Sequence, residues 1–175
     1  MKITFEFNTT DDQDRDLLFS MLQDLKAAYE QEPEDESPPD EDAYIQAWDQ
    51  CSMEIILFAV TILQIRDGDS NKGVYAYFSS FKTDNKNNLC GDLSERAISS
   101  RVGRTVVVCN KIGNFRLMET GLRRKDQVKR VYLNHDAKEI LIKLLKTDWG
   151  NAFDNYLLEI GKPANYLQQI LDKIG

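Results

Sequence analysis

The residues best suited to do chemistry in this chain are basic and hydroxyl side chains gathered between Ser94 and Leu133. This segment holds ten Lys or Arg and three acidic residues, a net charge of +7 inside a chain whose net charge is −7. Arginine pairs bidentately with phosphate oxygens and with guanine edges, and the hydroxyls of Ser99, Ser100 and Thr105 can donate to the same groups. Because a local field of this sign attracts a phosphate backbone, the segment predicts a nucleic-acid interface.

The candidate interface residues divide between a predicted helix and a predicted hairpin. A helix over 94–112 places its apolar side chains on one side and the polar residues on the opposite side; the apolar set is Ile98, Val102, Val106, Cys109 and Ile112. Gly103 leaves a second interpretation open, in which a turn at 102–104 divides this helix. The residues expected to face base edges or nearby phosphates are Arg96, Ser99, Ser100, Arg101, Arg104 and Lys111. Those expected to neutralise phosphates from the hairpin are Arg123, Arg124, Lys125, Lys129 and Arg130.

Other chemistry is sparse in this sequence. His135 is the single histidine, and the three cysteines are widely separated, so no zinc pattern is present. Asp67 and Asp69 lack the remaining positions of a calcium loop. No phosphate-binding glycine loop or nucleophile-elbow motif occurs. We therefore expect a protein that is not an enzyme and takes no metal or cofactor, with the reduced thiols that are typical of the cytoplasm.

Acidic residues concentrate at the other end of the chain. Residues 1–50 carry fifteen acidic and three basic residues, whereas 51–175 carry fourteen acidic and nineteen basic ones. The stretch 30–42 is rich in Asp, Glu and Pro, which is typical of a linker because it has little apolar surface to bury. Two interpretations stay open: a solubilising spacer, or an internal mimic of nucleic acid that competes for the basic face.

Hydrophobic periodicity predicts the elements around the basic helix. In chain order they are a strand–helix extension over 1–29, the linker 30–42, an apolar helix over 43–66, a turn over 67–73, a short aromatic helix over 74–81, strands over 115–120 and 128–133, a helix capped by Asn134, and amphipathic helices over 147–175. The most apolar run, 55–65, is too short to span a membrane, which needs about 20 residues.

The succession of a helix, a helix, a long basic helix, a two-stranded hairpin and a closing helix resembles a winged-helix DNA-binding domain of the helix-turn-helix class. The resemblance covers roughly residues 54–146 and is carried by Leu93–Gly113, the basic tip 123–125 and the strand Lys129–Leu133. It implies a mainly α fold with a small β component (α+β), with the domain over 43–146. It also implies that the polar face of the 94–112 helix enters the major groove while the hairpin follows the backbone or the minor groove.

These patterns together predict a cytoplasmic regulator of transcription that binds specific double-stranded DNA sequences. Helices flanking a winged helix often dimerise it, so the stripes over 147–175 favour a homodimer. One alternative is a protein-binding adaptor or inhibitor in which the 30–42 segment mimics nucleic acid. Another is a DNA-binding component of replication or of a mobile element.

Overall fold

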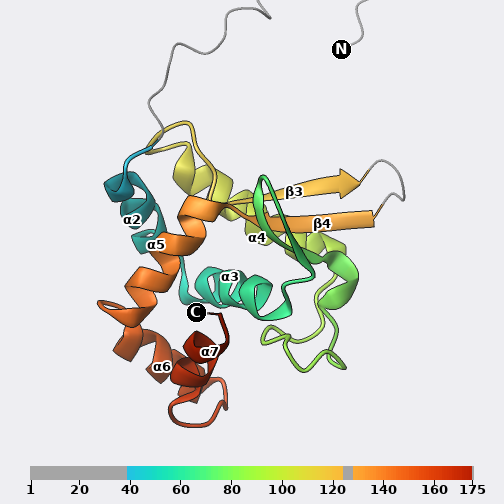
Figure 1. Cartoon of the computed structure of the whole chain (residues 1–175), viewed down its shortest axis with the longest axis vertical. Coiled ribbons are helices and arrows are strands. Elements are labelled where there is room, and N and C mark those ends of the chain that lie inside the picture. The colour runs from blue at the N-terminus through green and yellow to red at the C-terminus, as the bar shows by residue number, and fades with distance from the viewer. Residues whose placement is uncertain (1–38, 124–127, 175) are drawn as a thin grey trace, which may run out of the picture. The chain divides into compact units, whose positions relative to one another are not determined.

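The computed structural model of this protein describes residues 39–123 and 128–174, with Arg123 described by its backbone alone. The expectations for the 1–29 extension and for most of the 30–42 linker lie outside these residues. The described elements are α2 (Glu41–Asp49), α3 (Met53–Ile65), β1 (Gly68–Ser70), β2 (Gly73–Tyr77), the 3-10 turn η1 (Phe78–Ser80), α4 (Glu95–Cys109), β3 (Met118–Arg123), β4 (Val128–Leu133), α5 (His135–Lys146), α6 (Gly150–Glu159) and α7 (Tyr166–Ile174). The predicted α+β class is confirmed (Figure 1).

A four-stranded antiparallel sheet has the order β1-β2-β4-β3. Successive side chains of a strand point to opposite faces, so each strand presents one residue set to the core and another outward. The inward set is buried and comprises Val74, Ala76, Met118, Val131 and Leu133. The outward set includes Tyr75, Tyr77, Arg130 and Tyr132, all only partly buried.

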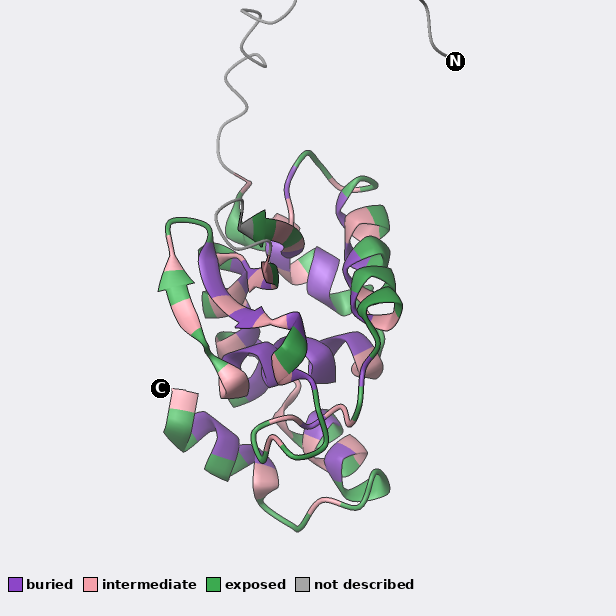
Figure 2. Ribbon diagram, turned by 90° about the vertical axis from the view of Figure 1, so that its right-hand side faces the viewer, coloured by how far each residue is buried: buried purple, intermediate pink, exposed green. Residues whose placement is uncertain are grey.

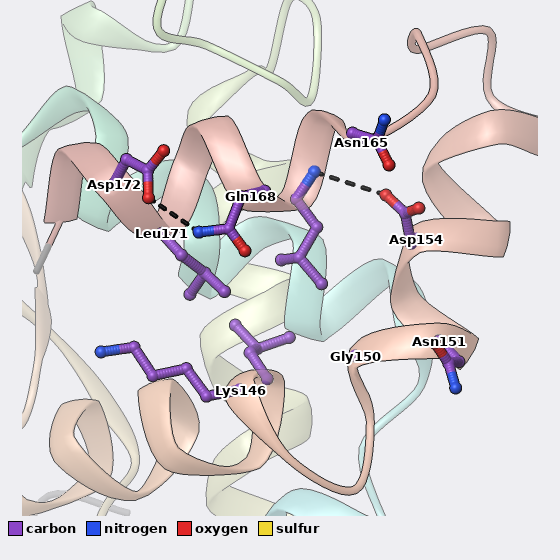
Figure 3. Close-up of a pocket in the computed structure, with 10 residues that line it drawn as sticks. Lys146, Gly150, Asn151, Asp154, Asn165, Gln168, Leu171 and Asp172 are labelled. Carbon is purple, nitrogen blue, oxygen red and sulfur yellow. Dashed lines mark hydrogen bonds between the residues drawn. The ribbon is translucent and has the colours of Figure 1, made fainter.

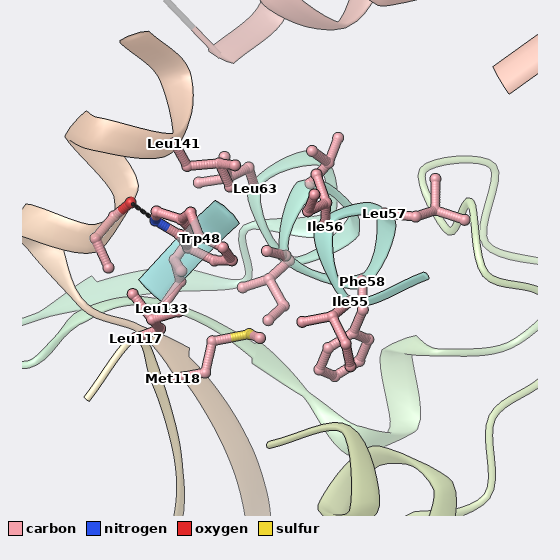
Figure 4. Close-up of a cluster of buried hydrophobic side chains, with 14 of the residues drawn as sticks. Trp48, Ile55, Ile56, Leu57, Phe58, Leu63, Leu117, Met118, Leu133 and Leu141 are labelled. Carbon is pink, nitrogen blue, oxygen red and sulfur yellow. Dashed lines mark hydrogen bonds between the residues drawn. The ribbon is translucent and has the colours of Figure 1, made fainter. Parts of the chain in front are cut away.

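Helix α3 lies at the centre of the core because it is apolar around most of its circumference, and Figure 2 shows how much of this region is buried. It packs against β2 and β4 on the inner face of the sheet. Trp48 of α2 is fully buried beside it, and its Nε1 donates a hydrogen bond of 3.0 Å to the carbonyl of Ala137 at the start of α5 (Figure 4). That bond ties α2 to α5.

Side-chain caps fix where three helices begin. Asp40 accepts from the amide of Ala43 at 2.9 Å, Ser94 from Ala97 at 3.2 Å and Asn134 from Asp136 at 3.0 Å. Each cap satisfies an amide that the first helical turn leaves unpaired. The cap predicted at Asn134 is confirmed.

The boundary between the acidic stretch and the next helix needs correction, since the predicted linker ended at Asp42. Asp40 instead caps α2, and Glu41 and Asp42 occupy its first turn, where negative charge is favourable. Glu41 also pairs with Lys143 of α5. These three acids therefore belong to the fold.

The single helix predicted over 43–66 is two helices, α2 and α3, separated at 50–52. Ser52 takes the N-cap position of α3 with an extended backbone. The apolar spacing continues across the break because both helices face the same core, so periodicity alone did not reveal it.

The short helix predicted over 74–81 is also wrong. Residues 73–77 form β2, followed by the turn η1, and the turn predicted over 67–73 contains β1. The buried residues Val74 and Ala76 alternate with Tyr75 and Tyr77, which is the period of a strand. Pairing with β4 fixes this conformation.

The basic helix is continuous through Gly103, so the divided alternative is wrong. It ends earlier than predicted, at Cys109, and Asn110 is its C-cap. The strand predicted to start at 115 begins at Met118, whereas the strand predicted over 128–133 is observed with those bounds.

The C-terminal helices and the sheet belong to one compact unit, and this unit begins at Pro39. Their buried side chains join the common core and are Phe153, Leu157, Leu167, Ile170 and Leu171. No helix within residues 39–123 and 128–174 combines the length and apolar character that a membrane span requires.

Candidate nucleic-acid interface

Helix α4 presents one polar side to solvent because its opposite side is held in the core. Its buried residues are Ile98, Val102, Thr105 and Cys109. The expectation that Thr105 donates to nucleic acid is therefore wrong, and its hydroxyl donates to the carbonyl of Val102 at 2.8 Å. At 100° per residue, this orientation turns the polar set outward. Arg96, Ser99, Ser100 and Arg104 are all exposed, together with Val107, whose exposed fraction is 57%. An exposed valine among cations is suited to contact with a thymine methyl group.

The β3–β4 hairpin lies beside the first turns of α4 (Figure 1). Lys129 forms an ion pair with Glu95, the first residue of the helix. A pocket of about 340 Å³ between the helix and the hairpin is lined by Ser99, Leu122 and Lys129, among others. Ser99 and Lys129 therefore face the same concave surface.

Arg101 has a different position from its neighbours on α4. Its Nη2 lies 2.5 Å from Oε1 of Glu54 on α3, and its guanidinium carbon lies 5.9 Å from the ring centroid of Phe58. The side chain is only 16% exposed. Arg101 therefore joins α4 to α3, and we assign it a structural role.

Arg104 contacts the other oxygen of Glu54, with Nη1 3.3 Å from Oε2, yet its side chain remains 59% exposed. Exposed ion pairs of this kind contribute only about 0–1 kcal/mol, so a phosphate can compete for the guanidinium. Arg104 stays in the candidate interface.

The predicted hairpin cations do not form one group. Lys129 faces α4, whereas Arg130 is the next residue along the strand and lies on the outer face of the sheet. There it contacts Tyr75 and Tyr77. Arg124 and Lys125 lie outside the described residues, as does the side chain of Arg123.

Lys111 is exposed but follows the end of α4. It therefore lies in the turn after the helix, on the same side of the helix axis as Arg104 when the helical spacing is continued. The residues that remain together on α4 and the adjoining hairpin are Arg96, Ser99, Ser100, Arg104 and Lys129.

Sequence reasoning missed Glu54 and the tyrosines of the outer sheet face. Glu54 is 47 residues from Arg101, and no local pattern links them. The tyrosines did carry a signal, because Tyr75 and Tyr77 alternate with buried residues as a half-buried strand requires.

Two further pockets lie away from this surface. One, of about 480 Å³, lies between α5, α6 and α7 (Figure 3). Three of its polar side chains pair within the protein: Asp154 accepts from the amide of Leu167 at 3.4 Å, and Gln168 donates to Asp172 at 2.7 Å. The geometry of these groups suggests no nucleophile with an adjacent base.

The second pocket, of about 470 Å³, is lined by Tyr44, Arg116, His135 and Asp136, among others. Burial, together with the nearby Asp136 carboxylate, raises the pKa of Tyr44 to about 12. This hydroxyl therefore stays protonated at neutral pH and is a poor general base.

The described surface with the clearest ligand preference is thus the exposed side of α4 with the adjoining hairpin, where cations, hydroxyls and an exposed valine lie together. Comparison with models of protein families, with curated proteins and with solved structures finds no match to this chain.

Proposed function

We propose that this protein binds double-stranded DNA as a winged helix, with α4 in the major groove and the β3–β4 hairpin against the backbone. The observation that carries the proposal is the two-sided character of α4. Its core side fixes the helix, and its other side leaves Arg96, Ser100 and Arg104 exposed along two turns. The major groove is about 12 Å wide and admits an α-helix presented in this way.

The order of elements agrees with a winged helix only in part. The hairpin and α5 follow the basic helix as expected, but the second helix of the resemblance, predicted over 74–81, is strand β2. The two helices that precede α4 are instead α2 and α3. The chain departs from a simple helix-turn-helix because β1, β2, the 3-10 turn η1 and an irregular stretch over 81–94 separate α3 from α4. In this protein α4 is held instead by its packing on β3 and by the contacts of Glu54.

In the proposed complex, Arg96 and the serines of α4 contact base edges, while Arg104 and Lys129 contact phosphates. The ion pairs Arg104–Glu54 and Lys129–Glu95 are exposed, so phosphates can replace the carboxylates at small cost. The neighbouring tip 123–125 adds three basic residues in sequence to the hairpin.

We further propose transcriptional regulation by a cytoplasmic homodimer. A two-fold dimer would place its two α4 helices about 34 Å apart, one turn of DNA. Leu158 and Ile160 at the end of α6 are exposed large apolar residues and offer a contact surface. Light scattering coupled to size-exclusion chromatography tests this proposal, and a monomer at all accessible concentrations would contradict it.

DNA binding is tested by fluorescence anisotropy with a labelled 20-base-pair duplex of mixed sequence, titrated with salt. If about six cations contact phosphates, the logarithm of the affinity should fall with the logarithm of salt concentration with a slope near −5. The variant with both Arg96→Ala and Arg104→Ala should bind more weakly and with a slope shallower by about 1, because Arg104 contacts a phosphate whereas Arg96 contacts a base edge.

Arg66→Ala is the matched control for these variants. Arg66 is an exposed arginine in an exposed ion pair with Asp69, at the opposite end of α3 from Glu54. Its loss should leave the slope unchanged. Failure of the duplex to bind at low salt, or equal weakening in the control, would refute the proposal.

A further inference from the structure

The outer face of the sheet carries a cluster of aromatic rings that the α4 interface does not use. The ring centroid of Tyr75 on β2 lies 5.5 Å from that of Tyr77 and 5.7 Å from that of Tyr132 on β4. We call Tyr75, Tyr77, Tyr132 and Arg130 the tyrosine platform. Its members are half-buried side chains on the face of the sheet opposite to the core.

Two glycines allow the rings to lean across the sheet. A Cβ atom at Gly68 on β1 would lie 2.5 Å from the hydroxyl oxygen of Tyr75, and one at Gly121 on β3 would lie 2.8 Å from Cε2 of Tyr132. Both rings therefore occupy space that a side chain on the neighbouring strand would fill. This arrangement spreads aromatic surface over all four strands.

The platform also carries positive charge. The guanidinium carbon of Arg130 lies 4.4 Å from the ring centroid of Tyr75 and 5.0 Å from that of Tyr77, and its Nη2 donates to the Tyr77 hydroxyl at 3.2 Å. Within the described part of the chain, Arg130 forms no ion pair with a carboxylate. At the edge of the platform, Lys72 pairs with Glu119 at 2.7 Å and lies 6.0 Å from the ring centroid of Tyr132.

We propose that the tyrosine platform is a second binding site, for single-stranded nucleic acid. Unpaired bases would stack on the tyrosine rings and on the Arg130 guanidinium, and Arg130 and Lys72 would attract the phosphates. An aromatic sheet surface with adjacent cations binds single strands because every base has a face that can stack. A duplex hides those faces, so this site differs in ligand from the α4 interface.

The position of the platform makes the two sites separable. Lys129 faces α4 and Arg130 belongs to the platform, so the same hairpin contributes to opposite faces of the sheet. A variant of one site should leave the other site intact. The second site therefore goes beyond the duplex binding proposed above and can be tested without it.

The test uses the full chain and a fluorescein-labelled 20-nucleotide oligo-dT, which forms no duplex, with binding followed by anisotropy. Tyr132→Leu and Tyr77→Leu remove a ring and keep an apolar side chain, and each should weaken binding about tenfold. Tyr132→Phe keeps the ring and should bind within about twofold of the wild type. Arg104→Ala should not change oligo-dT binding.

Tyr166→Leu is a matched control, because Tyr166 is a half-buried tyrosine on α7 with Lys162 5.8 Å from its ring centroid. Photocrosslinking of the wild-type protein to an oligonucleotide containing 5-bromodeoxyuridine gives an independent measurement that needs no variant. Crosslinks at Tyr75, Tyr77 or Tyr132 are the expected result.

Three results would overturn the proposal: no binding of oligo-dT at low salt, equal binding by the folded Leu variants, or crosslinks confined to α4. Circular dichroism tests whether each Leu variant is folded. If a variant is unfolded, the crosslinking of the wild-type protein decides whether the platform binds the oligonucleotide. Loss of duplex binding in Arg104→Ala with oligo-dT binding intact would separate the two sites directly.

Discussion

Glu54 lies between two arginines of α4, with one carboxylate oxygen 2.5 Å from Arg101 and the other 3.3 Å from Arg104. The two contacts differ in their environment, because Arg101 is largely buried and Arg104 is mostly exposed. The pair with Arg101 therefore contributes to the packing of α4 on α3, whereas the pair with Arg104 mainly sets the charge at the edge of the interface.

Replacing Glu54 with glutamine separates these two effects. Glu54→Gln should bind duplex DNA about two- to fivefold more tightly at low salt, because a negative charge beside the interface is removed. The free energy of unfolding should fall by about 1 kcal/mol, since Arg101 loses a charged partner. Anisotropy and urea denaturation measure the two quantities. Glu139→Gln, an exposed acid on α5, is the control, and unchanged DNA affinity in Glu54→Gln would contradict the proposed interface.

The three cysteines form another residue-level case. Burial raises the pKa of Cys51 to about 12 and also raises the pKa values of Cys90 and Cys109. Because the thiolate is the reactive form, all three should be alkylated slowly by iodoacetamide at pH 8. Mass spectrometry should show at least tenfold faster labelling in urea than in the folded protein. A cysteine that is labelled equally fast in both conditions would show that its thiol is not buried in the folded protein.

At the scale of elements, two glycines differ in whether the structure leaves room for a side chain. Gly73 at the start of β2 has φ of +138°, and a Cβ atom there would overlap the carbonyl oxygen of Leu133 on β4. Gly103 in α4 has no atom within 4 Å of the corresponding position. The first glycine is required by the sheet, whereas the second only adds backbone freedom to a helix.

Alanine substitutions at these positions should therefore change stability in opposite directions. Gly73→Ala should lower the free energy of unfolding by about 2 kcal/mol or more, and Gly103→Ala should raise it by about 0.5–1 kcal/mol. Urea denaturation monitored by circular dichroism gives both values. A stabilised Gly73→Ala protein would mean that the β2–β4 pairing is not as described.

Sequence patterns predicted those elements that depend mainly on interactions between residues close in sequence. The cap at Asn134 and the strand over 128–133 were both correct, and helical spacing identified Ile98, Val102 and Cys109 on the inward side of α4 but not Thr105. The helix break at 50–52 and the strand β2 could not be recovered in this way. Both depend on packing against residues distant in sequence, such as the pairing of Val74 with Leu133.

The candidate site follows the same division. The exposure of Arg96, Ser100 and Arg104 could be predicted from the helix period, whereas the contact of Arg101 with Glu54 joins residues 47 positions apart. The opposite orientation of Lys129 and Arg130 was available from the strand period. It was missed because both residues were assigned by charge alone.

For the whole molecule, the separation of charge has a measurable effect. Residues 1–38 hold eleven acidic and three basic residues, so their net charge is −8 and that of residues 39–175 is +1. The latter form a compact unit with its own core. A chain starting at Pro39 should therefore fold.

Removal of residues 1–38 should also increase duplex affinity at low salt, since eight units of net negative charge are lost. The gain should shrink as salt is raised from 50 to 200 mM, because the screening length shortens. Anisotropy of the two chains across this range makes the comparison. A gain that is independent of salt would exclude long-range electrostatics as its cause.

The hydrogen bond from Trp48 to Ala137 cannot form until long after Trp48 has been synthesised. Its two partners are 89 residues apart, and the same pair of helices is joined by Glu41 and Lys143. A ribosome adding about 5–20 residues per second needs roughly 4–18 s to make the intervening chain. During that interval the indole of the nascent chain has no native acceptor, so we expect the inward face of α2 to be open to chaperones until α5 emerges from the exit tunnel.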